Sequence, residues 1–365
     1  MAMKINEDGS LGEIIDPLNG TQDIEKRMIT LAGAGGIVSD PLRILRAIRF
    51  AAKLGFDIEP STLAEMKNKA LLLKNTSPER ILAELLLILE TPQSAGFFRH
   101  MDQLGILEVV FPEIKHMKGC QQNSYHHKDV WEHSLVVMEN GEQILNHLPE
   151  FFDAWSEQVT GNLDGDNRSA LLKLATLLHD VGKPSTRDVN QETGRITFHD
   201  HDSAGAEIVG QISGRLKMSA RDRNYLTLLV AEHIHVLNLS NREVTPRTKM
   251  KWFRKMKDDA IPAIILGISD VKGTLGVDAG KDAITGQIQW SRDVVREYYE
   301  EIKKKLERNV LITGRDLIAL GIKPGTEMGA ILAKILEAQD DGTVQSRDEA
   351  LAMAGGLVSE KKIKH

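Results

Sequence analysis

The chain has 365 residues, of which 41% are hydrophobic and 27% charged, and its formal net charge is −6. This length allows two or three domains, and the mild charge excludes a chain that is basic throughout, as many non-specific nucleic-acid binders are. The single cysteine, Cys120, excludes an intramolecular disulfide and a cysteine-rich zinc site. Without a basic-then-apolar leader, or an apolar run near the roughly 18 residues of a membrane helix, we expect a cytoplasmic protein without membrane segments.

The N-terminal stretch has the pattern of a β-hairpin. Residues 1–5 and 13–16 are predicted strands, and residues 7–9 form the turn, because Asp-Gly is a common tight-turn pair. Two strands alone are only marginally stable. We therefore interpret this hairpin as the end of a larger sheet.

The rest of the chain has helical periodicity. Ser39-Asp40-Pro41 predicts a cap followed by proline at the first helical position, and Gly55 predicts the end of that helix. Further helices are predicted from about Pro60 and Pro78 and in WEHSLVVMENGEQIL, SALLKLATLLHD, YLTLLVAEHIHVL, DAIPAIILGISD and IQWSRDVVREYYEEIKKKL. GNLDGDNRS is a predicted loop, and Lys323-Pro324-Gly325 divides two late helices. The expected fold class is all-α: an elongated multi-helical array after a short hairpin.

Histidines and aspartates on inward helix faces are the candidate metal ligands. His179-Asp180 ends one helix, and a Gly-Lys-Pro turn follows it. His133, His233 and Asp270 each share a helix face with apolar residues. Buried histidines and aspartates without partners are costly, and a metal ion neutralises several together. Alone, the His-Asp pair would favour an ordinary helix end, with Gly182 and Pro184 as stop signals.

Two positions remain ambiguous in the sequence. His199 and His201 would share one face of an extended segment, so periodicity does not choose between them. His233 and His235 face different ways on a helix, and we take His235 as the bystander. Lys183, just after the His-Asp pair, is expected to bind or polarise a phosphate oxygen.

The order His133, His179-Asp180, His201, His233, Asp270 resembles the ligand order of the HD phosphohydrolase superfamily. The resemblance implies that His133, His179, Asp180 and Asp270 hold one divalent ion. His201 and His233 would hold a second ion or position phosphate. Ligands of these types suit Mn, Fe, Co, Ni or Zn, with Mg as a further candidate.

The sequence segments around these residues resemble one branch of that superfamily. YHHKDVWEHSL, LLHDVGKP, FHDHDSAGAEIV and ISDVKGTLG are similar to the HD region of bacterial class II tRNA nucleotidyltransferases and poly(A) polymerases. DPLRILRAIRFAAKLGFDIEPSTL and LITGRDLIALGIKPGTEMGAILAKILEAQDDG resemble that family's neck and tail. The resemblance implies four parts: a remnant of the nucleotidyltransferase head at 1–35, an RNA-binding-like helical neck at 36–115, an HD metal-dependent phosphohydrolase domain at 116–305 and a tRNA-binding-like helical tail at 306–365.

The sequence departs from the family pattern in two places. The family's head polymerises with a Gly-Gly phosphate loop and two magnesium-binding carboxylates, which would precede Met1. In the family, a Glu-Asp-x-x-Arg motif recognises the incoming base. The corresponding residues here are Ser39-Asp40-Pro41-Leu42-Arg43, in which Asp40 and Arg43 match the motif and Ser39 does not. Asp40, Arg43 and Arg46 are the candidate RNA or nucleotide contacts. The sequence leaves open whether Met1 is the native start.

Basic residues occur in two further stretches. Arg43, Arg46, Arg49 and Lys53 fall near one helix face, and residues 249–257 mix lysines and arginines with Trp252 and Phe253. Both patterns suit RNA binding with stacked bases. A solvated basic face over core aromatics explains each equally well.

These observations lead to the expectation of a divalent-metal-dependent phosphohydrolase that acts on nucleotides, 2′,3′-cyclic phosphates or RNA 3′ ends. Asp180 and Lys183 are its candidate catalytic residues, and the chain alone is expected to add no nucleotides. tRNA or another RNA is the expected macromolecular partner. Two alternatives stay open: a truncated or split tRNA nucleotidyltransferase whose head is separate, and a non-catalytic tRNA-binding protein. The oligomeric state is not determined by the sequence.

Overall fold

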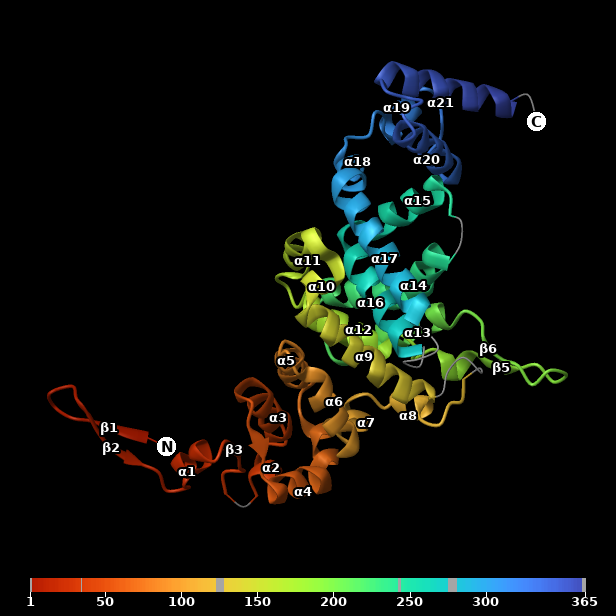
Figure 1. Cartoon of the computed structure of the whole chain (residues 1–365). Coiled ribbons are helices and arrows are strands. Elements are labelled where there is room, and N and C mark those ends of the chain that lie inside the picture. The colour runs from red at the N-terminus through yellow and green to blue at the C-terminus, as the bar shows by residue number, and fades with distance from the viewer. Residues whose placement is uncertain (1, 34, 123–127, 242–243, 275–280, 363–365) are drawn as a thin grey trace. The chain divides into compact units, whose positions relative to one another are not determined.

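The structure, a computed structural model, is predominantly helical (Figure 1). It describes residues 2–33, 35–122, 128–241, 244–274 and 281–362, so parts of the words YHHKDVWEHSL and ISDVKGTLG lie outside the described residues. The chain forms two compact units, one of Met1–Arg242 with Asp258–Val295 and one of Glu243–Lys257 with Arg296–His365. The all-α prediction is confirmed. No described helix has the length and apolar character that crossing a membrane requires.

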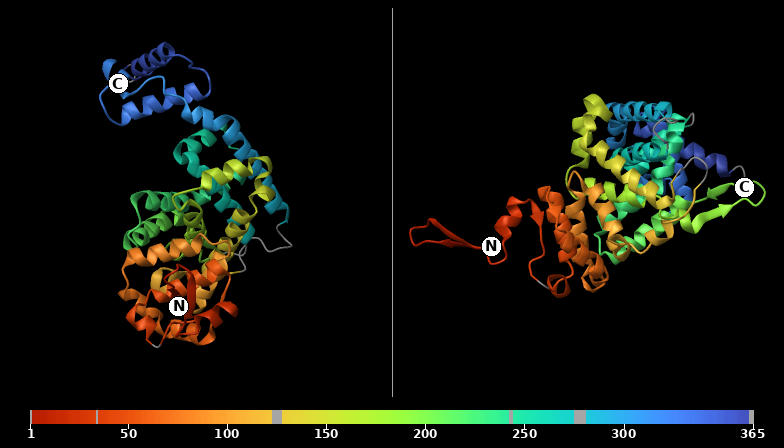
Figure 2. Two further views of the ribbon diagram at one scale, coloured as in Figure 1. Left: turned by 90° about the vertical axis from the view of Figure 1, so that its left-hand side faces the viewer. Right: turned by 60° about the horizontal axis from the view of Figure 1, so that its bottom comes forward.

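The predicted N-terminal hairpin is present. Strands β1 (Ala2–Ile5) and β2 (Leu11–Ile15) pair antiparallel, with Ala2 opposite Ile15, and helix α1 (Gly20–Glu25) follows. The hairpin projects from the helices that follow it (Figure 2). Ile5 and Leu11 are 71% and 72% exposed. The hairpin therefore carries apolar side chains without a core of its own.

Short helices and a small parallel sheet make up the neck region. The elements are α2 (Gly36–Ser39), α3 (Arg43–Leu54), α4 (Pro60–Lys69), η1 (Ala70–Asn75), α5 (Pro78–Leu89), α6 (Ser94–Gln103), α7 (Ile106–Val110) and α8 (Ile114–Met117). Strand β3 (Met28–Ile29) pairs in parallel with β4 (Asp57–Ile58), which the sequence did not predict. The predicted cap at Ser39 was wrong. Its hydroxyl donates to Gly36 O, and α3 begins only at Arg43 because Asp40 is extended.

Four helices surround the candidate metal ligands. They are α9 (Val130–Asn146), α12 (Arg168–Leu178), α14 (Ala220–Asn241) and α16 (Ala260–Thr274). Residues 170–178 of α12 are all buried, so α12 is the central one of these four helices. The predicted loop GNLDGDNRS is shorter than expected, because α11 (Ser156–Leu163) continues through its first residues.

Smaller elements complete this unit. They are α10 (Leu148–Phe152), η2 (Asp153–Trp155), η3 (Lys183–Thr186), β5 (Arg187–Val189), β6 (Ile196–Phe198), α13 (His201–Arg215), η4 (Lys257–Asp259) and α17 (Lys281–Glu297). β5 and β6 form a hairpin that projects beside α13 (Figures 1 and 2). In the sequence, this hairpin lies between the His179-Asp180 pair and His201. Its two ends lie close together, so the pair and His201 are adjacent in space.

The second unit is also helical. Its elements are α15 (Pro246–Met256), η5 (Tyr298–Ile302), α18 (Lys303–Glu307), α19 (Gly314–Ala319), α20 (Thr326–Asp340) and α21 (Arg347–Lys362). Trp252 and Phe253 are buried, and Phe253 stacks on Tyr298 with ring centroids 5.4 Å apart. Because both rings are packed in the core, the aromatic residues of this stretch do not provide a stacking surface for bases.

Candidate metal centre

Six predicted ligands from five elements converge in the core of the first unit. His133 comes from α9, His179 and Asp180 from the end of α12, His201 from the start of α13, His233 from α14 and Asp270 from α16. None is more than 9% exposed. Oδ1 of Asp270 lies 3.1 Å from Nε2 of His133, and Oδ2 of Asp180 lies 3.2 Å from Nε2 of His179. The structure thus places all six side chains at one centre.

The histidines are oriented as metal ligands. Nδ1 of His179, His201 and His233 lies 2.9, 2.8 and 2.6 Å from a backbone carbonyl oxygen. Nδ1–H donates these bonds and so directs Nε2 inward, as in histidine-ligated metal sites. Nε2 of His201 and Nε2 of His233 are only 3.3 Å apart, so two lone pairs face each other. A shared cation or proton relieves this repulsion, and the residues therefore fit a metal ion.

The ligand atoms fall into two overlapping groups. One contains His133, His179 and Asp180, and the other contains Asp180, His201 and His233; within each, the atoms lie within 4.8 Å of one another. Asp180 belongs to both groups. Its carboxylate is therefore suited to bridge two adjacent ions.

The structure resolves both sequence ambiguities. His199 is exposed, whereas His201 is 9% exposed and lies 3.4 Å from Oδ1 of Asp180. The side chain of His235 is 57% exposed and lies beside Glu232. Period-two spacing did not separate His199 from His201 because helix α13 starts at His201, where the backbone geometry changes. For His233 and His235, the choice made from helix geometry agrees with the structure.

Lys183 does not face open solvent as a free cation. Its Nζ lies 2.7 Å from Oδ2 of Asp180 and donates a 2.7 Å hydrogen bond to Oε1 of Gln122. The Phe198 ring lies below this ammonium group, at 5.5 Å. Sequence reasoning missed Gln122, since nothing in its local pattern distinguishes it from an ordinary loop glutamine.

Burial and charge at the centre shift pKa values in opposite directions. Burial opposes the charged form of His179, but the carboxylates of Asp180 and Asp270 outweigh it and raise its pKa to about 10. Burial and the nearby His179 lower the pKa of His233 to about 4. Burial alone would raise the pKa of Asp180, but His179 and Lys183 hold it well below its usual value. The centre thus contains ionised carboxylates together with a neutral His233.

Close helix packing at glycines positions the ligands. Gly267 shares the inward face of α16 with Asp270. In the structure, a Cβ at Gly267 would meet Val236 of α14 at 2.8 Å. The space at Gly267 is therefore occupied by the neighbouring helix, which also carries His233.

The predicted RNA contacts lie at the end of α2 (Asp40) and in the first turn of α3 (Arg43 and Arg46). Both carboxylate oxygens of Asp40 lie 3.2 Å from the Arg80 guanidinium. The Arg43 guanidinium occupies the space next to Gly36, and Arg46 is exposed. Asp40 is thus held by an arginine from α5, while Arg46 is the side chain of this group that faces solvent.

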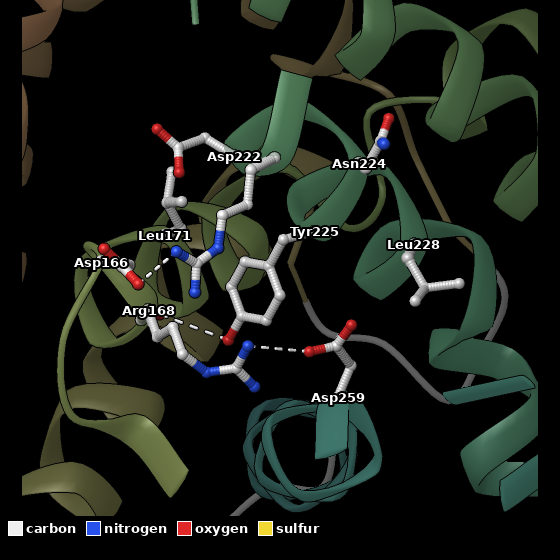
Figure 3. Close-up of a pocket in the computed structure, with 9 residues that line it drawn as sticks. Asp166, Arg168, Leu171, Asp222, Asn224, Tyr225, Leu228 and Asp259 are labelled. Carbon is white, nitrogen blue, oxygen red and sulfur yellow. Dashed lines mark hydrogen bonds and ion pairs between the residues drawn. The ribbon is translucent and has the colours of Figure 1, made fainter. Parts of the chain in front are cut away.

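A separate cavity of about 250 Å³ lies between the start of α12, the start of α14 and Asp259 (Figure 3). Arg168 pairs with Asp259 at 2.9 Å, Arg221 pairs with Asp166, and the Tyr225 hydroxyl donates to Arg168 O. Its arginines are thus matched by carboxylates. No predicted site residue lines it.

Two family models match the chain. One, described as "Probable RNA and SrmB- binding site of polymerase A", matches residues 55–118. The other, the HD domain, matches residues 130–271 and includes all six ligands. The expected HD domain and its family context are confirmed.

Relatives of known activity extend this match along nearly the whole chain. The A-adding tRNA nucleotidyltransferase of Deinococcus radiodurans is 31% identical over 345 residues, which cover 93% of this chain and 73% of the relative. The chain belongs to the tRNA nucleotidyltransferase family. The CC-adding tRNA nucleotidyltransferase of Thermus thermophilus is 30% identical, over 91% of this chain and 70% of the relative.

Solved structures of this family have the same fold. A CCA-adding enzyme in complex with CTP superposes with a TM-score of 0.58 at 22% identity, over 99% of this chain and 70% of that chain. An apo form gives a TM-score of 0.56 at 20% identity, over 93% of this chain, and the chain spans 64% of that structure's length.

These relatives correct the expected activity. The prediction of a metal-dependent phosphohydrolase was wrong, and so was the expectation that the chain adds no nucleotides, because the matched relatives are named tRNA nucleotidyltransferases. The error has a physical origin. Convergent histidines and aspartates indicate that a metal ion can bind, but they do not specify which reaction, if any, occurs there.

Proposed function

We propose that this protein takes part in adding nucleotides to the 3′ end of tRNA. The observation that carries the proposal is the identity of 30–31% to A-adding and CC-adding enzymes across more than nine-tenths of the chain. The match at residues 55–118 to an RNA-binding model supports tRNA as the macromolecular partner. Nucleoside triphosphates are the small-molecule substrates of this reaction.

We further propose a division of labour along the chain. The neck (36–115) and the tail (306–365) bind tRNA, the HD domain (116–305) connects them, and the hairpin region (1–35) belongs with the nucleotidyltransferase head. The exposed apolar side chains of β1 and β2 support the last assignment, since a larger sheet with a layer packed on its face would bury them. Co-purification tests whether a separately encoded head associates with this chain.

Nucleotide addition by the protein expressed from the full gene tests the function. We expect labelled CTP or ATP to be incorporated into tRNA that lacks some or all of its terminal CCA, and the accepted tRNA end identifies CC or A addition. Arg46→Ala removes an exposed cation from α3 and should weaken tRNA binding roughly two- to tenfold, with a shallower salt dependence. Arg223→Ala, on the exposed face of α14 and outside the neck and tail, is the matched control.

Two results would contradict this proposal. One is the absence of nucleotide incorporation with every tRNA end. The other is a tRNA affinity that does not differ from the affinity for an unrelated RNA of equal length.

We also propose that the HD centre binds one or two divalent transition-metal ions, among Mn, Fe, Co, Ni and Zn, with Mg as a further candidate. His133, His179, Asp180 and Asp270 would hold the first ion, and His201 and His233 with Asp180 the second. A bound ion supplies positive charge that attracts phosphate oxygens. Lys183 contacts Asp180 at 2.7 Å and orients its carboxylate toward the ligand cluster.

Metal binding should release a proton. Without metal, His179 is protonated below its pKa of about 10, and its Nε2 binds a metal only after losing that proton. The dissociation constant should therefore rise about tenfold when the pH falls from about 9 to about 8. Calorimetry in two buffers of different ionisation enthalpy measures the released proton, and His235→Ala is the control. An affinity that does not change with pH would contradict the assignment of His179.

A further inference from the structure

Asp180 presents its two carboxylate oxygens to different histidines. Oδ2 lies 3.2 Å from Nε2 of His179 and 3.5 Å from Nε2 of His133. Oδ1 lies 3.4 Å from Nε2 of His201 and 3.7 Å from Nε2 of His233. The rotation of this one side chain therefore decides which oxygen faces which pair of ligands.

Lys183 holds one of these oxygens. Its Nζ lies 2.7 Å from Oδ2 of Asp180, and the lysine is only 8% exposed. A carboxylate oxygen has two lone pairs, so Oδ2 can accept from Lys183 and still face a cation between the histidines. A lysine side chain is long and flexible, however, and a single contact leaves the place of its ammonium group poorly defined.

Gln122 supplies a second contact to this ammonium group. Its Oε1 accepts a 2.7 Å hydrogen bond from Lys183 Nζ, and its Nε2 donates to Lys128 O at 3.3 Å. An ammonium group only donates and a carbonyl oxygen only accepts, so these two neighbours fix the orientation of the amide. Gln122 is 8% exposed, and both polar ends of its side chain are engaged.

The backbone next to Gln122 is also held in place. Cys120 O accepts from Val130 N at 3.1 Å. Gly119 N donates to Asp129 Oδ2 at 2.7 Å. These contacts attach the segment to the start of α9, the helix that carries the first of the predicted ligands. Gln122 is therefore a fixed point from which the lysine can be positioned.

We propose that Gln122 is a positioning residue of the metal centre. It holds Lys183 on Oδ2 of Asp180, and it thereby fixes the rotation at which this carboxylate presents one oxygen to each pair of histidines. The inference rests on the proposed metal binding and adds to it a residue that is not a ligand. It concerns the strength and the geometry of metal binding, and it is separate from nucleotide addition to tRNA.

Gln122→Met tests this role, since methionine is similar in length and offers no strong acceptor. The ammonium charge of Lys183 remains in this variant, and only its placement is lost. We expect the dissociation constant for Co²⁺ to rise about tenfold, the lower end of the range for groups that orient metal ligands. The visible absorption of bound Co²⁺, which reports the ligand geometry, should also change. Gln121→Met, at an exposed neighbour, is the matched control.

A double-mutant cycle separates positioning from a merely structural role. If Gln122 acts through Lys183, Gln122→Met should change the Co²⁺ affinity by less than about twofold once Lys183→Met is present. A residue that only stabilises the segment before α9 would weaken the affinity equally in both backgrounds. Gln122→Asn, which shortens the amide by one methylene, should show the same coupling and is used if Gln122→Met does not fold.

The measurements use metal-stripped full-length protein, and thermal unfolding of each variant excludes misfolding. An unchanged Co²⁺ affinity and absorption in Gln122→Met would overturn the inference, as would equal losses in the two backgrounds. Either result leaves metal binding by the unchanged protein intact. If the unchanged protein binds neither Co²⁺ nor Mn²⁺, the proposed metal binding itself is wrong, and the role of Gln122 falls with it. The two failures are therefore distinguishable.

Discussion

Replacing Gly182 with alanine should destabilise the protein by about 3 kcal/mol, the upper end of the usual cost of overpacking, and weaken metal binding. A Cβ at Gly182 would lie 2.2 Å from His201 O and 2.5 Å from Gly205 N. Both are backbone atoms, so no side-chain rotation relieves the clash. Helix α13 would have to move away from the His-Asp turn, and His201 would move with it. Chemical denaturation and metal titration measure the two effects.

The backbone conformation does not explain this requirement for glycine. Gly182 has φ −79° and ψ −19°, which alanine adopts readily. The control is Gly210→Ala in α13, the helix that approaches Gly182. A Cβ at Gly210 has no neighbour within 4 Å, and helix propensity favours alanine over glycine there by about 0.5–1 kcal/mol. Unchanged stability and metal affinity in Gly182→Ala would refute the close approach of α13 to this turn.

Loss of the buried Lys173–Glu142 pair should have a similarly large effect. Lys173 Nζ donates to Thr91 O at 2.7 Å, Ser94 Oγ at 3.2 Å and Glu142 Oε1 at 3.0 Å. Lys173 and Glu142 are 4% and 8% exposed. Removing one partner leaves a buried charge that is no longer compensated, so Lys173→Met should cost about 3–5 kcal/mol in urea denaturation.

The double variant is the internal control. Lys173→Met with Glu142→Leu removes both charges together, so we expect it to be more stable than Lys173→Met alone. The exposed pair Lys69–Glu65 on α4 offers a comparison, since Lys69→Met should change stability by no more than about 1 kcal/mol. Strict additivity of the Lys173 and Glu142 single effects would contradict a coupled buried pair.

This pair also joins two parts of the first unit. Thr91 and Ser94 lie at the corner between α5 and α6, Glu142 lies on α9 and Lys173 on α12. Helices α9 and α12 carry His133 and His179. The neck region and the metal centre are thus held together by a hydrogen-bonded ion pair that no local sequence pattern indicated.

Local sequence rules determined much of this protein. Helix periodicity and proline at the first helical position predicted α4 and α5, and the Asp-Gly turn predicted the β1–β2 hairpin, because these signals act within a few residues. The inward faces of α9, α14 and α16 identified His133, His233 and Asp270 as candidate ligands for the same reason. The order of the ligands indicated the family, and the relatives confirm it.

Only the tertiary structure decided which of the remaining groups meet. The selection of His201 over His199, the contact of Gln122 with Lys183 and the buried partner of Lys173 each depend on residues distant in sequence. Periodicity defines the face of an element but not the neighbour that covers it. Long-range contacts are set by how helices pack, and that packing is fixed by the combined burial of many side chains.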